Sequence, residues 1–392
     1  MFFLKPKTKL LLALNVNAST VQAVVFLARK NGKPEITRTF QKVAAFPPKA
    51  DFSVLLQGIK QALAEIFKEI GKSAPIDGVF VSLSSSWYFA QPKIIKLRER
   101  ENFELTEEIL DQQLEKTISS VKEEFEKKFS VSKEELAILE SRLFKILLNG
   151  YQVFDFRNKK IKTAELYVYL TVAPLGLTEE IKKIAKENLG ANNVHFHTSS
   201  FILFEKMREI FGWDESFLIV DVGEEITEVM IVKSGLIKEI SSFSKGGNFI
   251  IRKIISSLKI TPEEAFSYLK MRGRNELIED LKSKIENILK EAFLEWEKSF
   301  KEILDDFYRF EGPLPERIFM FNSALLPEQF AAAASFPELS DIFARGVPPV
   351  VLPFMPAAFR DEFLKESAFK DHKEIVVSFL TLFFNRHVWE KS

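Results

Sequence analysis

The sequence predicts an α/β protein with two or more domains. A chain of 392 residues, 46% of them hydrophobic, is long enough to bury more than one sizeable core. Short apolar runs rich in β-branched and aromatic residues, such as 78–83 and 317–321, predict buried strands. Other stretches, such as 51–70, carry apolar residues at helical spacing, and Gly71 follows as a stop signal. Strands and helices therefore alternate along the chain.

Composition and charge exclude several classes of function. The 55 basic and 55 acidic side chains cancel, which argues against a surface built for nucleic acid or another polyanion. Without cysteine the chain forms no disulfide and no thiolate metal site, which suits a cytosolic protein. No apolar run approaches the roughly 18 residues of a membrane span, so we expect a soluble protein. Residues 1–9 combine three bulky apolar residues with three lysines, and we expect a frayed end with at most peripheral membrane contact.

The stretch 217–247 carries the strongest chemical pattern. Three strand-like runs follow one another with tight turns between them: 217–220, 227–232 and 236–243. The first turn holds Asp221 and Gly223, and Thr227 opens the second run. Such a turn brings backbone N–H groups, a carboxylate and a hydroxyl around one point. Phosphate and its divalent cation bind to groups of these kinds.

These residues resemble a known phosphate-binding hairpin. The pattern Asp221-x-Gly223-x-x-x-Thr227, followed by Gly246-Gly247, is similar to the second phosphate hairpin of the actin, Hsp70 and sugar-kinase superfamily. Within it the pattern looks most like the bacterial actin-like proteins FtsA and PilM. The resemblance implies a two-lobed actin-like (ribonuclease H-like) α/β fold. It also implies that these five residues contact ATP and Mg as cofactors.

Residues 10–27 correspond to the first phosphate hairpin of this superfamily. The turn residues that would face the nucleotide are Asn15, Asn17, Ser19 and Thr20. The superfamily pattern has Asp and Gly where this chain has Asn15 and Asn17. Asn15 lacks the charge that holds a metal-bound water, and a side chain at position 17 hinders the approach of phosphate. We therefore expect the hairpin to form and ATP turnover to be weak or absent.

Residues 93–173 predict a small α+β unit. A strand leads to Thr106, a good N-cap, and to a helix, after which three strands return, giving the order β-α-β-β-β. The segments 148–153 and 166–170 resemble the inserted subdomain that FtsA and PilM carry in place of the usual second-lobe insertion of actin. This second resemblance narrows the superfamily to the FtsA/PilM branch.

The second half of the chain departs from the family at one turn. Thr261, Pro262 and Glu264 predict a helix start, and helical patterning continues through 275–310. The strand 317–321 would enter the glycine-rich adenosine turn of the family. However, residues 322–334 contain no glycine, which removes room for a ribose or a base.

Two histidines are candidate metal ligands. His195 and His197 lie two apart on a predicted strand and so share a face. No third ligand is near in sequence, and we interpret both as ordinary strand residues. We expect no metal ligands and no catalytic residue among the protein side chains.

The resemblance implies a division of the chain into five segments. They are the first lobe (1–92), the inserted subdomain (93–173), more of the first lobe (174–212), the second lobe with a helical outer part (213–325) and a closing segment of the first lobe (326–392). The last segment ends in a predicted helix, 373–387. Its apolar run is too short to cross a bilayer.

The resemblance implies a cytoplasmic scaffold, placed at the inner face of the membrane, that organises type IV pilus or cell-division machinery. Its partners would be short cytoplasmic tails of membrane proteins, with self-association as a further expectation. The lack of a detached C-terminal amphipathic helix favours PilM over FtsA. One alternative is an active Mg-ATP-binding, polymerising ATPase. Another is a sugar or acetate-type kinase, which needs an intact adenosine turn.

Overall fold

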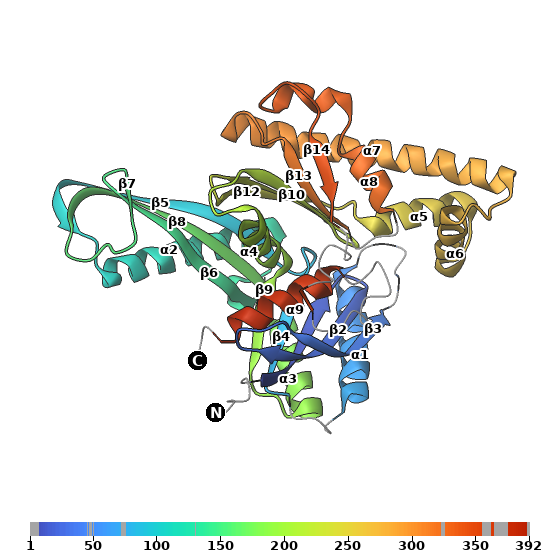
Figure 1. The fold of residues 1–392 in the computed structure, drawn as a ribbon, viewed down its shortest axis with the longest axis horizontal. Helices are drawn as coiled ribbons and strands as arrows, with labels where there is room; N and C mark the ends of the chain where they lie inside the picture. Colours follow the sequence, from blue (N-terminus) through green and yellow to red (C-terminus); the bar gives the residue numbers. More distant parts are fainter. Residues whose placement is uncertain are drawn as a thin grey trace, which may run out of the picture.

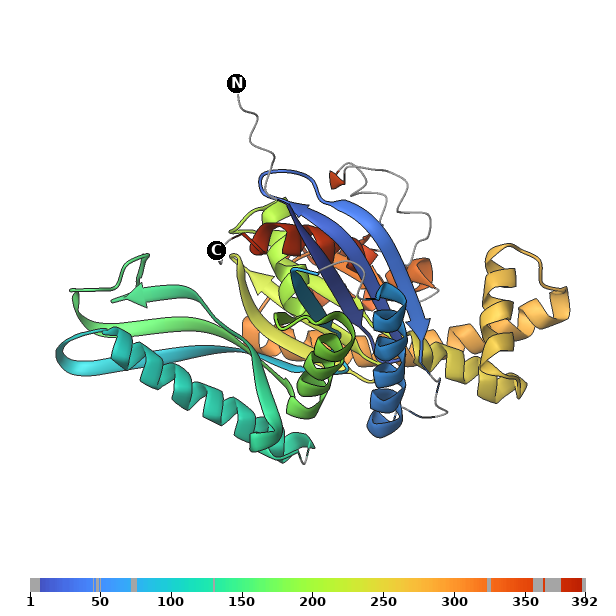
Figure 2. The same cartoon turned by 90° about the horizontal axis from the view of Figure 1, so that it is seen from below.

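The structure is a computed structural model that describes residues 8–44, 46, 49, 51–71, 76–129, 131–322, 326–354, 362–363 and 375–389. Within these residues the chain forms three β-sheets with helices packed on them (Figure 1). One sheet projects from one end of the long axis, and α6 lies at the other end (Figure 2). The α/β class predicted from the sequence is confirmed.

The first sheet has the strand order β3-β2-β1-β4-β9. Its strands are β1 (Thr8–Val16), β2 (Thr20–Arg29), β3 (Glu35–Val43), β4 (Gly78–Leu83) and β9 (Val194–Thr198). The first three form an antiparallel meander, and β4 and β9 continue the sheet in parallel. The helices packed on it are α1 (Phe52–Ile70), α3 (Leu175–Leu189), α4 (Ser199–Phe211) and α9 (Ile375–His387). The pair α1 and α3 pack together, as do α4 and α9.

The second sheet repeats this topology. Its order is β12-β11-β10-β13-β14, again a meander of three antiparallel strands followed by two parallel ones. The strands are β10 (Phe217–Val222), β11 (Thr227–Lys233), β12 (Leu236–Phe243), β13 (Arg317–Asn322) and β14 (Val350–Pro353). Its helices are α5 (Gly247–Leu258), α6 (Pro262–Gly273), α7 (Glu279–Glu311) and α8 (Pro327–Ala333). The chain therefore contains two lobes of one design.

The apolar run that opens the predicted hairpin is buried on both faces of its strand. Side chains alternate along β10, so Phe217 and Ile219 join the core shared with the first lobe, while Leu218 and Val220 join the core under α5 and α7. A strand that is covered on both sides reads as a continuous apolar run, because neither face meets water.

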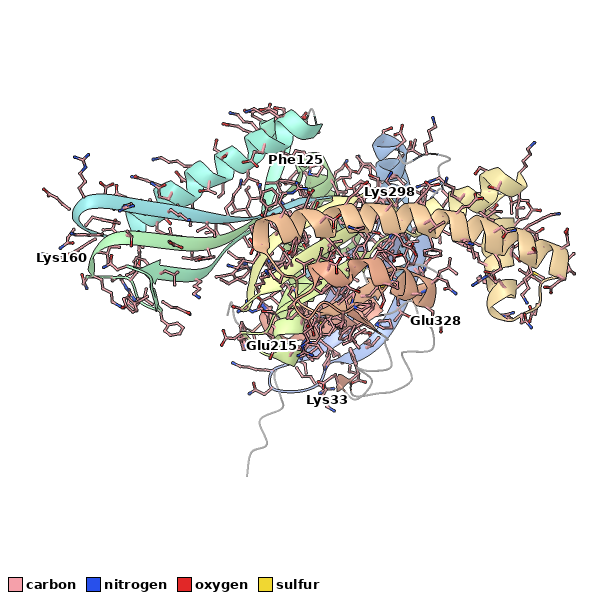
Figure 3. All side chains as sticks on the ribbon, turned by 90° about the horizontal axis from the view of Figure 1, so that it is seen from above. Lys33, Phe125, Lys160, Glu215, Lys298 and Glu328 are labelled. Carbon is pink, nitrogen blue, oxygen red and sulfur yellow. The ribbon has the colours of Figure 1, made fainter. Side chains whose placement is uncertain are left out.

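The third sheet is the projecting one, with the order β5-β8-β6-β7. Its strands are β5 (Phe89–Glu104), β6 (Leu136–Leu148), β7 (Tyr151–Val153) and β8 (Lys160–Pro174), and α2 (Glu107–Phe129) packs on it. Thr106 caps α2 as predicted, with Oγ1 3.2 Å from the backbone N of Ile109. Figure 3 shows buried Phe125 near the lobes and Lys160 at the far end of the sheet.

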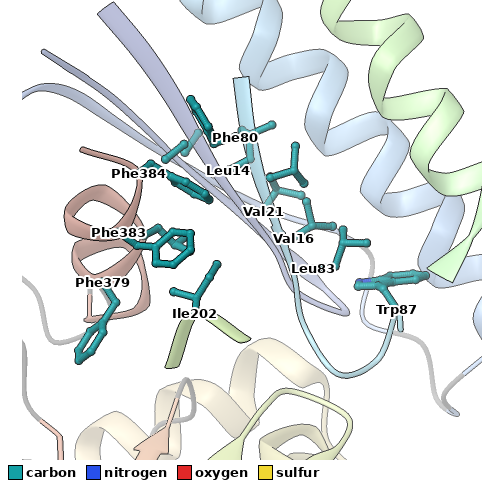
Figure 4. Packing of buried hydrophobic residues seen from close by; sticks show 14 of the residues in the cluster. Leu14, Val16, Val21, Phe80, Leu83, Trp87, Ile202, Phe379, Phe383 and Phe384 are labelled. Atoms are coloured by element: carbon teal, nitrogen blue, oxygen red, sulfur yellow. The ribbon is translucent and has the colours of Figure 1, made fainter. Parts of the chain in front are cut away.

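Aromatic side chains fasten α9 to the first lobe. Phe80 of β4 and Phe384 of α9 have ring centroids 4.5 Å apart (Figure 4). Phe379 packs edge-on against Phe321 of β13, with centroids 5.5 Å apart, so α9 also touches the second sheet. The many phenylalanines of the sequence therefore join the two lobes through one apolar core.

The expected division of the chain differs from the structure at its last boundary. Residues 326–392 were expected in the first lobe, but α8 packs on α7, and β14 pairs with β13. Leu326 and Phe330 are buried in the same core as Trp296. These apolar contacts bind residues 326–354 to the second lobe, whereas α9 packs on the first sheet.

The helices that the structure describes include none with enough length and apolar character to cross a membrane.

Candidate functional site

The tips of two equivalent hairpins face each other between the lobes. The tip of the first lies between β1 and β2, and the tip of the second lies between β10 and β11. Beside them is a cavity of about 610 Å³, here called the cleft cavity. Four predicted site residues line it: Asn17, Ser19, Thr20 and Gly247. The other five, Asn15, Asp221, Gly223, Thr227 and Gly246, do not line it.

The turn of the second hairpin packs on the N-terminus of α5. The backbone N–H groups of Gly246, Gly247 and Asn248 donate to the carbonyls of Glu225, Gly223 and Glu224, at 3.0, 2.9 and 2.7 Å. A Cβ atom on Gly246 would lie 2.4 Å from the Gly223 oxygen, so only glycine fits there. These N–H groups at the N-terminus of α5 are therefore hydrogen-bonded to carbonyl groups of the turn. The turn itself covers the positive end of the α5 dipole.

Thr227 is turned away from the cavity. Its side chain is buried, with Oγ1 donating to the Lys245 carbonyl at 2.8 Å and accepting from Trp296 Nε1 at 3.1 Å. Thr227 thus ties the hairpin to α7. Trp296 is fully buried.

The Glu224 carboxylate accepts hydrogen bonds from the donors at the tip of the first hairpin. Its carboxylate accepts from the backbone N–H and the hydroxyl of Ser19, the latter at 2.9 Å, and from the Thr20 hydroxyl. Burial raises the pKa of Glu224, while the bonds from Thr20 and Ser19 act in the opposite direction. Asn248 Nδ2 adds a bond to Ser19 Oγ at 3.2 Å. The second lobe therefore inserts a carboxylate where a phosphate would need these donors.

Glu225, the next residue, has a different role. Its carboxylate accepts from both terminal nitrogens of Arg252 and from Asn248 Nδ2 at 2.8 Å. This two-pronged ion pair holds the turn against α5. The sequence alone does not reveal the roles of these two glutamates, because their partners lie far along the chain.

The two asparagines of the first hairpin bond within it. Asn15 Nδ2 lies 3.3 Å from Asn17 Oδ1 and 3.2 Å from Gln22 Oε1, and Asn17 Nδ2 donates to Thr20 Oγ1 at 3.1 Å. Trp87 Nε1 donates to the Asn17 carbonyl at 2.8 Å. The amides thus stiffen the turn.

Two buried carboxyl groups lie opposite each other at the base of the second hairpin. Asp221 and Glu228 are register partners on β10 and β11. Asp221 accepts from Ser199 Oγ at 3.2 Å, and Glu228 accepts from Tyr88 OH at 2.8 Å. Burial raises the pKa of Asp221 to about 6 and the pKa of Glu228 to about 8. Asp221 therefore bonds to α4 of the first lobe and does not face the cavity.

No group of three or more metal-ligating side chains occurs within the described ranges. His197 Nδ1 lies 3.4 Å from Glu140 Oε1, and its ring stacks on Phe201. The His195 ring stacks on Phe80. The predicted adenosine turn falls largely on residues 323–325, which lie outside the described residues.

These contacts decide how well the cleft suits Mg-ATP. A triphosphate needs free N–H and hydroxyl donors at the hairpin tips and a charged carboxylate for the cation. Here the donors of Ser19 and Thr20 are bonded to Glu224, and Asp221 is bonded to Ser199. The groups that a triphosphate would need are therefore bonded to one another in this structure, and the cavity beside them has the size of a ligand site.

A second hollow of about 440 Å³ lies between the projecting sheet and the first lobe. We call it the arginine pocket. It is lined by Arg142, Leu143, Phe144, Phe201, Glu205, Arg208, Trp213 and His387. Sequence reasoning missed it, because its residues come from β6, α4 and two later segments, with no local motif.

The arginine pocket offers cationic and aromatic groups together. Arg208 pairs with Glu205 at 3.0 Å and stacks over the ring of Trp213 at 4.1 Å, and Trp213 is 54% exposed. Arg142 lies 5.3 Å over the ring of Phe201. The Nε atoms of both arginines are buried without a hydrogen-bond partner in the described part of the chain.

Two lobes of one topology around a cleft, with a third sheet inserted in the first lobe, define an actin-like fold. This class, predicted from the sequence, is confirmed by comparison with solved structures.

Solved structures match nearly the whole chain. A structure of the PilM-PilN type IV pilus biogenesis complex matches with a TM-score of 0.62 at 15% identity, covering 95% of this chain and 97% of that one. The ethanolamine utilization protein EutJ from Carboxydothermus hydrogenoformans matches at 12% identity, with 97% and 91% coverage and a TM-score of 0.46. MreB 5 of Spiroplasma citri bound to AMPPNP matches at 13% identity, with 98% coverage of each chain and a TM-score of 0.46.

No family model and no curated protein sequence matches the chain. The similarity therefore resides in the fold.

Proposed function

We propose that this protein is an actin-like scaffold of the FtsA/PilM type that holds a membrane-associated assembly together at the inner face of the membrane. In this proposal it binds short cytoplasmic tails of membrane proteins and does not depend on ATP turnover. We assign the assembly to type IV pili, with cell division as the alternative. The domain division stays part of this proposal, with residues 326–354 moved to the second lobe.

The arginine pocket carries the proposal. Its lining residues come from β6 of the projecting sheet and from α4 of the first lobe, so a bound tail would touch both units. The guanidinium groups of Arg142 and Arg208 line the pocket and favour a ligand that brings a carboxylate, and Trp213 and Phe144 favour an apolar side chain beside it. A short tail with an acidic residue next to an aromatic or aliphatic one meets both requirements.

Binding of short synthetic tails of this composition, measured by fluorescence polarisation, tests the proposal. The double variant Arg142→Ala/Arg208→Ala is expected to lose at least about tenfold in affinity, because hot-spot arginines contribute this much at interfaces. The matched control is Arg345→Ala, since the Arg345 side chain is exposed and does not line the pocket. Equal binding by the double variant and the wild type would refute the proposed site.

The Glu224 contacts support a scaffold that works without nucleotide. The alternative function is a polymerising Mg-ATPase. The size of the cleft cavity, which suits a small-molecule ligand, favours this alternative. Calorimetry with Mg-ATP and an assay of phosphate release separate the two. Low-micromolar binding with phosphate release would establish the ATPase instead.

A further inference from the structure

We propose that the cleft cavity is a binding site for an uncharged ring ligand of nucleoside size, and that Glu224 keeps phosphate-bearing ligands out. The inference deepens the proposed function, since it rests on a cleft that does not turn over ATP. It is independent of tail binding at the arginine pocket.

The walls of the cleft cavity suit a flat apolar ring. Ile250 and Ile251 of α5, Phe266 and Leu269 of α6 and Phe330 of α8 line it. Phe46 completes the wall from the first lobe, edge-on to Phe266 at 6.0 Å between ring centroids. A volume of about 610 Å³ lies within the range of small-molecule sites, which are mostly apolar with a few polar groups.

The polar groups of the rim suit a neutral ligand. Gln41, Ser267, Glu263 and Lys270 line the cavity with exposed side chains. They offer both donors and acceptors to the hydroxyl or amide groups of a ligand. One molecule can therefore bury its ring in the apolar part of the cavity and form hydrogen bonds at the rim.

The inner end of the cavity disfavours an anion. Glu224 lines it, and its carboxylate holds the Ser19 and Thr20 donors from the first lobe. The amides of Gly247 and Asn248 donate to turn carbonyls. A phosphate placed here would meet a carboxylate and find these donors already bonded. Its repulsion by Glu224 is strengthened by burial, because charges interact more strongly away from water.

Calorimetric titration of the full chain with adenosine, AMP and Mg-ATP tests the inference. These probes share a ring and a sugar and differ in their phosphates. Adenosine is expected to bind, and Mg-ATP to bind at least tenfold more weakly. Absence of adenosine binding at millimolar concentration, or Mg-ATP binding as tight as that of adenosine, would overturn the proposal.

Two variants examine the assigned roles. Glu224→Ala frees the donors of the first hairpin, so Mg-ATP affinity is expected to rise at least tenfold while adenosine affinity changes less than threefold. Leu269→Trp fills the apolar part and is expected to abolish adenosine binding. Glu291→Ala removes an exposed carboxylate of α7 that does not line the cavity; it is the matched control and is expected to leave the ratio of the two affinities within threefold. An unchanged ratio in Glu224→Ala contradicts the role of Glu224.

Circular dichroism and thermal unfolding establish that each variant is folded. Tail binding measured on the same samples separates the two proposals. If adenosine fails to bind while tails still bind, the cavity inference is wrong and the scaffold function stands. If tails fail while adenosine binds, the reverse holds.

Discussion

The cleft cavity and the arginine pocket both lie where two units of the chain meet, yet their charged groups are satisfied in opposite ways. In the cleft the Glu224 carboxylate accepts three hydrogen bonds from Ser19 and Thr20. In the arginine pocket the Nε atoms of Arg142 and Arg208 are buried with no bond from the described residues. The Glu224 carboxylate is thus bonded to the other lobe, whereas each of the two guanidinium groups has one N–H group without a partner among the described residues.

The difference indicates where an outside charged partner gains most. A buried polar group without a partner costs roughly 1–3 kcal/mol, and a ligand that supplies the partner recovers it. A carboxylate entering the arginine pocket would meet the guanidinium groups of Arg142 and Arg208. An anion entering the cleft must first displace Glu224.

We expect the largest effect from a change in the turn of the second hairpin, beside the cleft cavity. Gly246→Ala places a Cβ 2.4 Å from the Gly223 oxygen and 2.6 Å from the Glu224 oxygen. We expect a loss of about 3 kcal/mol in the free energy of unfolding, measured by urea denaturation, because overpacking against backbone forces the turn off α5. Gly176→Ala is the control, since its Cβ meets nothing within 4 Å in a helix. A Gly246→Ala protein as stable as wild type would mean that the hairpin tip can move freely.

A change in the arginine pocket should alter the affinity for tails and not the free energy of unfolding. Arg208→Lys keeps the charge but loses the planar stack on Trp213 and the fork geometry, so we expect about tenfold weaker tail binding. Glu224→Ala, in the other junction, should leave tail affinity unchanged. Fluorescence polarisation measures both. A comparable loss in Glu224→Ala would show that the two hollows are coupled.

A pH series sharpens the comparison at the carboxyl groups between the lobes. The pKa of Glu228 is raised to about 8 from 4.5, so the folded protein keeps a proton that the unfolded chain releases. This contribution to stability is fully present below pH 4.5 and is lost as the pH rises through 8. Glu228→Gln mimics the protonated form. Relative to wild type it should gain at least about 1 kcal/mol of unfolding free energy between pH 5 and pH 9. Thermal unfolding at both pH values measures the gain, and parallel pH profiles would contradict the assignment.

The smallest effect is expected at a surface ion pair, where water already satisfies both charges. Lys284 and Asp280 lie 2.7 Å apart one helical turn from each other on α7, with side chains 59% and 76% exposed. Lys284→Ala should change the unfolding free energy by less than about 0.5 kcal/mol in urea denaturation. A larger loss would mean that α7 depends on this pair.

Local sequence patterns predicted much of the fold. The capping box of Thr261 and Glu264 begins α6, and Asp51 caps α1 by accepting from Ser53 and Val54. Both caps act over two or three residues, which is why a sequence pattern contains them whole. The sequence did not predict β14. It is a four-residue edge strand with exposed Val350, and buried and exposed side chains do not alternate along it.

The candidate site was predicted in part. Asp221, Gly223 and Gly246 do meet at the hairpin turn, but they serve the packing of that turn on α5 and its link to α4. The pattern of residue types is the same for a phosphate cradle and for a turn that closes on itself. The neighbours decide between the two, and they lie elsewhere in the chain.

The sequence by itself determined the strand runs, the helix ends and the two hairpins, since each depends on side chains within a few positions of one another. Tertiary structure alone decided what the hairpins face. Glu224 meets Ser19 across a separation of 205 positions, and Arg142 and Arg208 reach one pocket from β6 and α4. The packing of whole sheets and helices sets such contacts, because burial of apolar faces fixes the lobes and the polar side chains at their junctions must pair with whatever that packing brings near.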